Sequence, residues 1–192
     1  MKEIIKQKLD ESADLKRKIG LELSDKIEEA ALKIIDVYKG GGKLILFGNG
    51  GSAADAQHIE TELVHQFEVK NRKALSAIAL TTNTSLLTAI GNDWGFDQIF
   101  ERQLQNLATD KDVVIGLSTS GNSMNVIRGI EQAKKNKSFT IALTGNDGGK
   151  IKDVADLSII VPSDNTARIQ EAHITIGHIL CHLIEKNLFG LR

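Results

Sequence analysis

Five short, nearly continuous apolar runs constrain the fold of this chain most strongly. They span residues 43–48, 75–80, 112–118, 139–145 and 157–163, and segments with helical periodicity separate them. Apolar runs of this length are typical of strands that are buried on both faces. Their alternation with helices predicts an α/β fold: a doubly wound, five-stranded parallel sheet flanked by helices, with the flavodoxin-like strand order.

Residues 1–40 precede the first of these runs and show helical periodicity of their own. Gly20 interrupts the periodic pattern, and the glycines at 40–42 end it where a left-handed C-cap is expected. We therefore predict an N-terminal helical hairpin attached to a single domain that spans residues 1–192. The hairpin packs on its own domain or joins subunits, and the pattern favours neither alternative.

Composition excludes several classes of function. The formal net charge of -1 and the pI near 6.5 give no basic surface for nucleic acid. Cys181 is the single cysteine, which excludes an intrachain disulfide and a cysteine-rich zinc site and fits a reducing compartment. The charged start does not resemble a signal peptide, and no apolar run approaches the ~20 residues of a membrane span. We expect a cytoplasmic protein with no membrane partner.

A glycine-rich loop follows the first apolar run directly. In Gly48-Asn49-Gly50-Gly51-Ser52-Ala53 the glycines permit a sharp turn and close approach to a ligand, and Ser52 with Asp55 predicts a capping box for the next helix. The spacing also satisfies the dinucleotide-binding fingerprint. That match is weak, because Thr81, Thr82 and Asn83 stand where an acid that holds the ribose is expected. A Walker-type lysine is also missing.

A second loop follows the third apolar run and is rich in hydroxyl groups. Ser118, Thr119, Ser120 and Ser123 surround Gly121 at the start of a predicted helix. Hydroxyl donors and a helix N-terminus together favour a bound phosphate. The same residues are also common in plain turns and caps. Two such loops on the first and third strands favour a ligand site, because these strands flank the switch point of the sheet.

Two predicted helices carry side chains that could meet at one point. His58 and Glu62 are four residues apart and share a helix face, and Gln170 and His178 lie on one face of the last helix. His182 fits that spacing as well as His178 does. For a lone histidine, an ordinary surface or hydrogen-bonded position is the more common explanation, and it is the one we adopt for His65, His173 and His182.

Several long motifs occur in order across most of the chain, and together they carry a resemblance. They are FGNGGSAADAQH, AIGNDWGF, STSGNSMNV, LTGNDGGK and ARIQEAHI. With them the sequence resembles the sugar-isomerase (SIS) domain family. The resemblance implies a five-stranded parallel sheet between helices, a homotetramer held partly by the N-terminal helices, and active sites between subunits. It also implies an aldose–ketose isomerase that converts sedoheptulose 7-phosphate to D-glycero-D-manno-heptose 7-phosphate, the first step of bacterial heptose biosynthesis.

The resemblance also assigns roles to residues of this sequence. It implies that Glu62 and His178 are catalytic and that one Zn²⁺ per subunit is bound by His58, Glu62, Gln170 and His178. The implied substrate-binding residues are Asn49, Gly50, Gly51, Ser52, Glu62, Asn92, Asp93, Ser118, Thr119, Ser120, Ser123 and Gln170. One departure is Gln66, where relatives often carry an arginine, so a charge-assisted contact there is in doubt.

The implied reaction requires two kinds of proton transfer. A proton moves between C1 and C2 through an enediol or enediolate, and another moves between the two oxygens. A carboxylate suits the first transfer and a histidine suits the second, so we assign Glu62 as the base and His178 as the acid. A metal would stabilise the developing oxyanion. Whether Glu62 is a base, a metal ligand or both is left open, as are the native metal and the destination of the heptose.

Two other classes of function remain as alternatives. One is a non-catalytic tetrameric adaptor similar to the replication-initiator-associating branch of the family, in which the residues matching Glu62 and His178 are replaced; both are present here. The other is a regulator that binds a sugar phosphate without converting it, and it is disfavoured because the chain carries no second domain. The catalytic interpretation is therefore preferred.

Overall fold

Five parallel strands form the centre of the molecule. The structure is a computed structural model that describes residues 1–190, and the strands are β1 (Leu44–Gly48), β2 (Ala77–Ala79), β3 (Val113–Ser118), β4 (Phe139–Gly145) and β5 (Leu157–Val161). They lie in the order β2-β1-β3-β4-β5, all paired in parallel. The predicted doubly wound sheet with flavodoxin-like order is confirmed, and its switch point lies between β1 and β3.

Seven α-helices and two short 3₁₀ helices connect and precede the strands within residues 1–190. They are α1 (Lys2–Glu22), α2 (Ser24–Lys39), α3 (Gly51–Val64), α4 (Thr84–Asp93), η1 (Phe96–Gln98), α5 (Glu101–Leu107), α6 (Met124–Lys135), η2 (Lys150–Asp153) and α7 (Thr166–Phe189). In this part of the chain no helix combines the length and the apolar character that crossing a bilayer requires.

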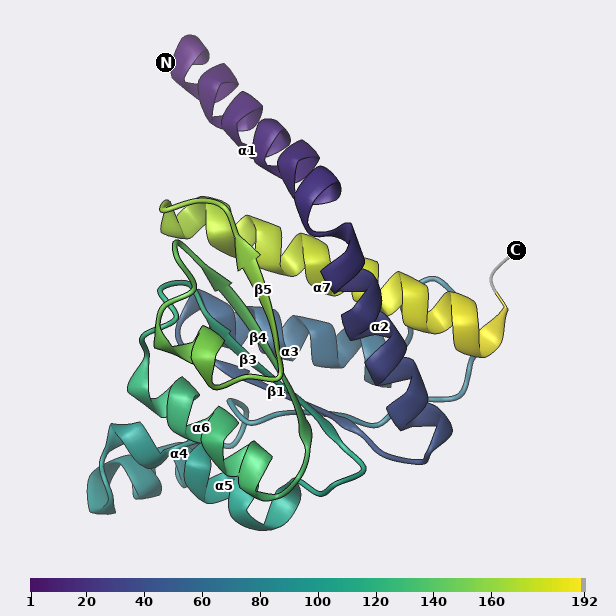
Figure 1. Cartoon of the computed structure of the whole chain (residues 1–192), viewed down its shortest axis with the longest axis vertical. Helices are drawn as coiled ribbons and strands as arrows, with labels where there is room; N and C mark the ends of the chain where they lie inside the picture. The colour runs from purple at the N-terminus through teal and green to yellow at the C-terminus, as the bar shows by residue number, and fades with distance from the viewer. Residues whose placement is uncertain (191–192) are drawn as a thin grey trace.

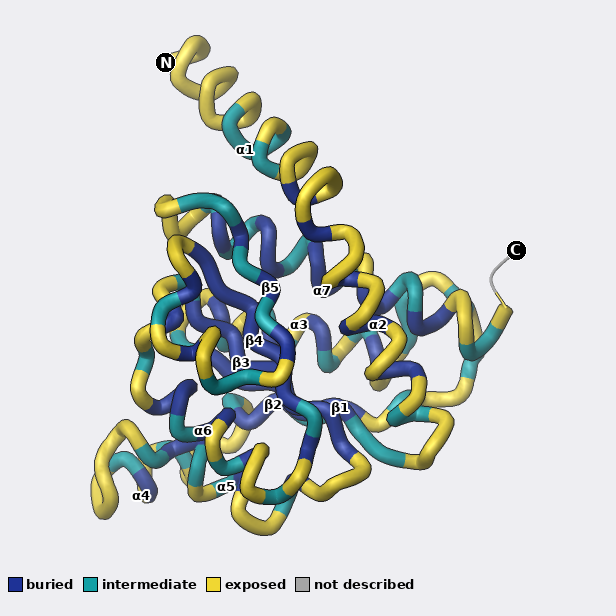
Figure 2. Tube along the Cα trace, viewed as in Figure 1, coloured by how far each residue is buried: buried dark blue, intermediate teal, exposed yellow. Residues whose placement is uncertain are grey.

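The sheet is covered on both faces, which explains why its strands are mostly apolar. Helices α2, α3 and α7 pack on one face, and α5 and α6 pack on the other (Figure 1). Along β1, Leu44 and Leu46 point into the first layer, whereas Ile45 and Phe47 point into the second. All four side chains are buried (Figure 2 shows β1 and β3 in dark blue). The alternating side chains of β1 therefore contribute to two hydrophobic cores, one on each face of the sheet.

The N-terminal helices differ from the predicted hairpin. Helix α1 continues through Gly20 to Glu22, and the chain bends at Leu23 before α2 begins. Figure 1 shows α1 and α2 nearly end to end rather than side by side, with the start of α1 extending beyond the domain. One glycine lowers helix stability by only about 1 kcal/mol, so Gly20 does not end the helix. Whether residues 1–40 join subunits stays a prediction.

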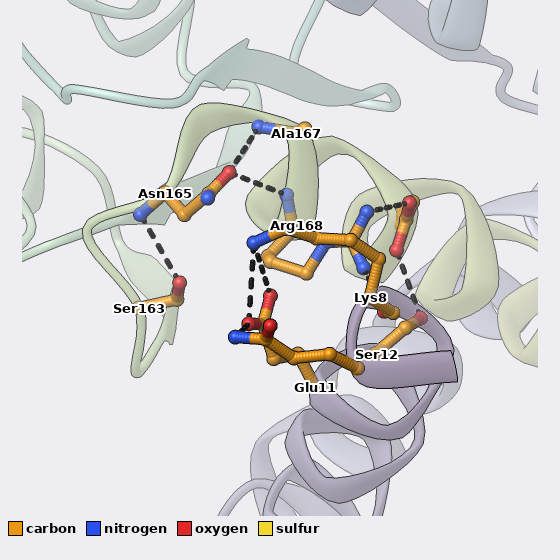
Figure 3. A network of polar contacts seen from close by, with 9 residues as sticks. Lys8, Glu11, Ser12, Ser163, Asn165, Ala167 and Arg168 are labelled. Carbon is orange, nitrogen blue, oxygen red and sulfur yellow. Dashed lines mark hydrogen bonds and ion pairs between the residues drawn. The ribbon is translucent and has the colours of Figure 1, made fainter. Parts of the chain in front are cut away.

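The middle of α1 is tied to the start of α7 by polar contacts (Figure 3). Asn165 caps α7 through its side-chain oxygen, which accepts from the N–H groups of the first turn at 3.0 and 3.3 Å. One turn later the Arg168 guanidinium donates to the Lys8 carbonyl, at 2.5 Å, and Ser12 donates to Glu171 at 2.8 Å. These contacts fix the direction in which α1 leaves the domain.

Candidate functional site

The loops after β1 and β3 meet at the switch point of the sheet. Gly50 has a φ of +55°, a left-handed conformation that glycine adopts readily. A Cβ on Gly48 would lie 2.9 Å from the Leu117 carbonyl oxygen of β3. The amides of Asn49 and Asn125 exchange two hydrogen bonds of 2.9 and 2.8 Å across the gap. Asn49 of the first loop is therefore tied to the first turn of α6, the helix that follows the second loop.

The predicted capping box at the start of α3 is wrong. Helix α3 begins at Gly51 with Gly50 as its N-cap residue, and a glycine has no side chain with which to cap. Ser52 is instead buried, with its Cβ packed beneath Gly48. Asp55 lies one turn before His58, and burial raises its pKa to about 6 against the opposing effect of His58. Within residues 1–190 its Oδ2 atom has no hydrogen-bond partner. Burial, not helix capping, therefore sets the surroundings of Asp55.

The hydroxyl loop after β3 is shaped by the segment that follows β4. Gly121 has a φ of +66°, and a Cβ there would lie 2.0 Å from the Gly148 carbonyl oxygen. Backbone hydrogen bonds join Gly145 N–H to Thr119 and Ile151 N–H to Gly121, both at 3.0 Å. The loop conformation is therefore set largely by backbone contacts.

The side chains of this loop lie where a small anion could be bound. The hydroxyls of Ser118 and Ser123 are 3.1 Å apart at the start of α6. Ser120 is exposed, and its Oγ accepts from Asn122 N–H at 3.2 Å. A shallow hollow of about 690 Å³ opens beside it, lined by Ser120, Asn122, Asn146, Asp147, Pro162, Ser163 and Asp164. Hydroxyl donors at a helix start suit a phosphate group, whereas the hollow beside Ser120 also carries the carboxylates of Asp147 and Asp164, which do not.

Three of the four predicted metal ligands converge where α3 and α7 face each other. His58 Nε2 lies 3.1 Å from Glu62 Oε1 and 3.3 Å from His178 Nε2, and the three ligand atoms all fall within 4.8 Å of one another. Ligand atoms placed tetrahedrally around zinc at its usual bond lengths are about 3.4 Å apart. Two imidazoles and a carboxylate are also an ordinary donor set for that metal. The cluster therefore fits a divalent metal, and the prediction that Glu62 and His178 lie together is confirmed.

Gln170 lies nearer the start of α7 than the cluster does. It is eight residues before His178, which corresponds to about 12 Å along the helix. Its side-chain amide packs directly over Gly51, where an added Cβ would lie 2.6 Å from the amide nitrogen. The structure thus places Gln170 beside the first loop, and its membership of the metal site stays a prediction.

Asn92 and Asp93 lie apart from this cluster within the chain. They end α4 and are exposed, and Asn92 donates to Asp93 at 2.7 Å. Figure 1 shows α4 at the far side of the sheet from α7. One chain by itself does not bring these predicted substrate-binding residues to Glu62 and His178.

The structure also distinguishes the histidines that spacing left equivalent. His182 contacts Glu68 at 2.8 Å and takes no part in the metal-ligand cluster. His173 is buried and its Nε2 lies 3.2 Å from the Thr144 carbonyl oxygen, and burial lowers its pKa to about 4. His182 therefore occupies an ordinary surface position and His173 a buried, hydrogen-bonded one, as predicted.

Sequence reasoning missed the loop that covers the cluster. The Phe67 ring stacks on the His178 imidazole, with centroids 5.4 Å apart and planes at 20°. Gln66, the departure noted above, accepts a hydrogen bond from Asn71 N–H at 3.1 Å and so closes the loop on itself. Phe67 and His178 are too far apart in the sequence for any spacing rule to pair them.

Comparison with known proteins gives a consistent result. The SIS domain family profile matches residues 9–145. A phosphoheptose isomerase of Citrifermentans bemidjiense is 55% identical over 185 residues, which cover 96% of each chain. The structure of a phosphoheptose isomerase from Neisseria gonorrhoeae matches with a TM-score of 0.91 and 42% identity, covering 96% of this chain and 98% of that one. One from Francisella tularensis matches with a TM-score of 0.92 and 37% identity, covering 96% and 97%.

Proposed function

The chain belongs to the SIS domain family and has the phosphoheptose isomerase activity of its relatives, and we propose that Glu62 and His178 carry the proton transfers of that reaction. The substrate is sedoheptulose 7-phosphate, and the expected product is D-glycero-D-manno-heptose 7-phosphate. The observation that carries the residue assignment is the convergence of Glu62 and His178 from two helices onto one point.

Each proton of the isomerisation has a defined route in this proposal. The Glu62 carboxylate takes a proton from C1 while His178 donates one to the C2 carbonyl oxygen, which gives the enediol. His178 then takes the proton of the C1 hydroxyl and Glu62 returns its proton to C2, which gives the aldose. Glu62 Oε1 lies 3.1 Å from His58 Nε2, and we assign the proton transfer to the other oxygen of the carboxylate, Oε2.

We also propose that the His58, Glu62 and His178 cluster holds one Zn²⁺, with Gln170 as a fourth ligand. Its three converging ligand atoms support a metal, and the resemblance supports zinc. A zinc ion in this place would supply Lewis-acid stabilisation of negative charge on the substrate oxygens. The proton transfers are assigned to Glu62 and to the ring nitrogen of His178 that does not bind the metal.

The substrate phosphate is bound by the hydroxyl loop in this proposal. Ser118, Thr119, Ser120 and Ser123 donate hydrogen bonds to it, and the start of α6 adds favourable potential. Asn49, Gly50, Gly51 and Ser52 line the sugar. The phosphate is remote from C1 and C2, so its binding energy serves to position the reacting carbons.

We propose that the active site is completed between subunits of a homotetramer. The separation of Asn92 and Asp93 from Glu62 supports a shared site. Ile4, Ile5 and Leu9 are exposed on α1, and an apolar groove of about 400 Å³ lies between the N-terminal helices and α7. Such surfaces suit association. The cytoplasm is the proposed location, which agrees with a single, buried Cys181.

Two experiments test the proposal. Incubation of the protein with sedoheptulose 7-phosphate should yield an aldose phosphate, detected by NMR, and absence of the aldose would contradict the activity. The shared site is tested by mixing Glu62→Gln and Asp93→Asn chains, each inactive alone. Mixed oligomers should recover activity, because some sites then receive both native residues. No recovery in verified mixed oligomers would contradict a site built from two subunits.

A further inference from the structure

One buried carboxylate holds the 65–76 loop, which joins α3 to β2, against the end of α7. The side chain of Glu185 is fully buried and so is that of Arg72, its ion-pair partner. The two oxygens of Glu185 accept hydrogen bonds from Arg72 and from three consecutive backbone N–H groups, those of Phe67, Glu68 and Val69, each at 2.8 Å. A single side chain thus fixes four successive points of the loop.

The buried contact of Glu185 with Arg72 and the loop backbone is held by charge, so its loss should lower the stability of the fold. Burial alone would raise the pKa of Glu185, but the Arg72 guanidinium and the three N–H groups outweigh burial and hold the pKa below its ordinary value. Glu185 is therefore charged, and its hydrogen bonds are of the strong, charge-assisted kind. The exposed contact between Glu68 and His182 contributes little by comparison.

Two residues that Glu185 binds in turn contact the two proposed catalytic residues. Phe67, whose N–H is bound by Glu185, stacks its ring on the His178 imidazole. Arg72 donates from Nη2 to the Glu62 backbone carbonyl oxygen at 2.7 Å, within the last turn of α3. Neither contact involves the carboxylate of Glu62 or the nitrogen atoms of the metal-ligand cluster. Glu185 therefore touches no reacting group, yet it fixes what surrounds both.

We infer that Glu185 is a positioning residue for the isomerase reaction, which holds the ring of His178 through Phe67 and the last turn of α3 through Arg72. This inference rests on the catalytic roles proposed above for Glu62 and His178. A displacement of about 1 Å in a catalytic group can lower the rate on the order of 100-fold. The phosphate-binding loop lies on a different element and should be unaffected.

The test compares Glu185→Gln with a matched control, Asp112→Asn. Asp112 is also a buried carboxylate, and it accepts hydrogen bonds from Lys43 N–H, Lys43 Nζ, Thr109 N–H and the Thr109 hydroxyl. It directly precedes β3 and so lies at the amino ends of the strands, whereas the ligand loops lie at their carboxyl ends. Both variants should lower the melting temperature. Assayed well below both melting temperatures, Glu185→Gln should lower kcat between about 10-fold and 100-fold with little change in KM, whereas Asp112→Asn should keep the native kcat.

A second variant separates positioning from loss of a buried charge. Phe67→Leu leaves Glu185 and Arg72 in place but removes the ring that stacks on His178. It should lower kcat with little loss of stability, and adding it to Glu185→Gln should cost less than the product of the two separate effects. This variant also decides the matter if Glu185→Gln does not fold.

Two results would overturn the inference: a folded Glu185→Gln protein with native kcat, or a Phe67→Leu protein with native kcat. The Glu62→Gln variant separates this failure from failure of the proposed function. If Glu62→Gln is inactive while the other two variants keep full activity, only the role of Glu185 is wrong. If Glu62→Gln keeps full activity, the catalytic assignment itself is wrong.

Discussion

The hydroxyl loop after β3 and the cluster on α3 and α7 are built in opposite ways. The loop spans six consecutive residues, 118–123, and its shape is set by backbone hydrogen bonds and by Gly121. The cluster draws on residues 120 positions apart, and only the packing of two helices brings them together. The first region is encoded locally and the second depends on tertiary structure. We expect changes in the loop to affect binding and changes in the cluster to affect turnover.

The close approach of α3 and α7 illustrates this dependence. A Cβ on Gly177 would lie 2.7 Å from the Ile59 side chain, so the two helices pack closer than any other residue would allow. Ile59 and Gly177 are the direct neighbours of His58 and His178. The contact that sets the distance between the helices is therefore next to the two histidines.

The largest expected effect comes from a change in the cluster on α3 and α7. Glu62→Gln should lower kcat about 10³-fold or more, because the amide cannot accept the carbon-bound proton. KM should change far less than kcat, since the phosphate loop is untouched. Steady-state kinetics with sedoheptulose 7-phosphate measure both constants, and circular dichroism verifies the fold. A native kcat would mean that Glu62 of the cluster does not take part in the chemical step.

Removal of metal should have the next largest effect. If the three converging ligand atoms hold zinc, chelation should lower activity on the order of 100-fold, and added Zn²⁺ should restore it. Metal analysis of the protein before and after chelation checks that the ion was lost. Full activity of a verified metal-free preparation would contradict a catalytic metal and leave the proton transfers to the side chains alone.

A smaller and different effect is expected in the loop. Ser120→Ala should raise KM about tenfold while kcat stays close to native, because a hydrogen bond to a charged phosphate is lost. The comparison with Glu62→Gln is informative, since the two changes should move different kinetic constants. A fall in kcat with unchanged KM would show that the loop does not serve binding.

The smallest expected effect concerns the link between the two regions. His173 joins α7 to Thr144, which pairs in register with Ser118 of the hydroxyl loop strand. Its pKa of about 4 lies below the unfolded value, so the unfolded state binds the extra proton between about pH 6.5 and pH 4. Stability should fall as the pH drops through that window, by at most ~3 kcal/mol. Urea unfolding at several pH values should show a shallower loss in His173→Gln, and equal slopes would contradict this.

The sequence predicts locally encoded parts well, and it predicts parts that depend on tertiary packing poorly. The five strands and the hydroxyl loop were predictable, because each is a continuous run with its own pattern. The capping box at Ser52 was wrong because burial beneath Gly48, not local hydrogen bonding, decides that position. Spacing placed His58 with Glu62, but it left His178 and His182 equivalent until the 65–76 loop was seen to hold His182. The partners of Glu185 lie 113 to 118 positions away, beyond any local pattern.

The central claim is that Glu62 takes the proton from C1, and solvent exchange at that carbon tests it most directly. In D₂O the native protein should place deuterium at C1 of recovered sedoheptulose 7-phosphate, observed by NMR. Ser120→Ala at saturating substrate should do the same at a comparable rate. Glu62→Gln should show no exchange above the enzyme-free background. Exchange by Glu62→Gln at the native rate would contradict the account.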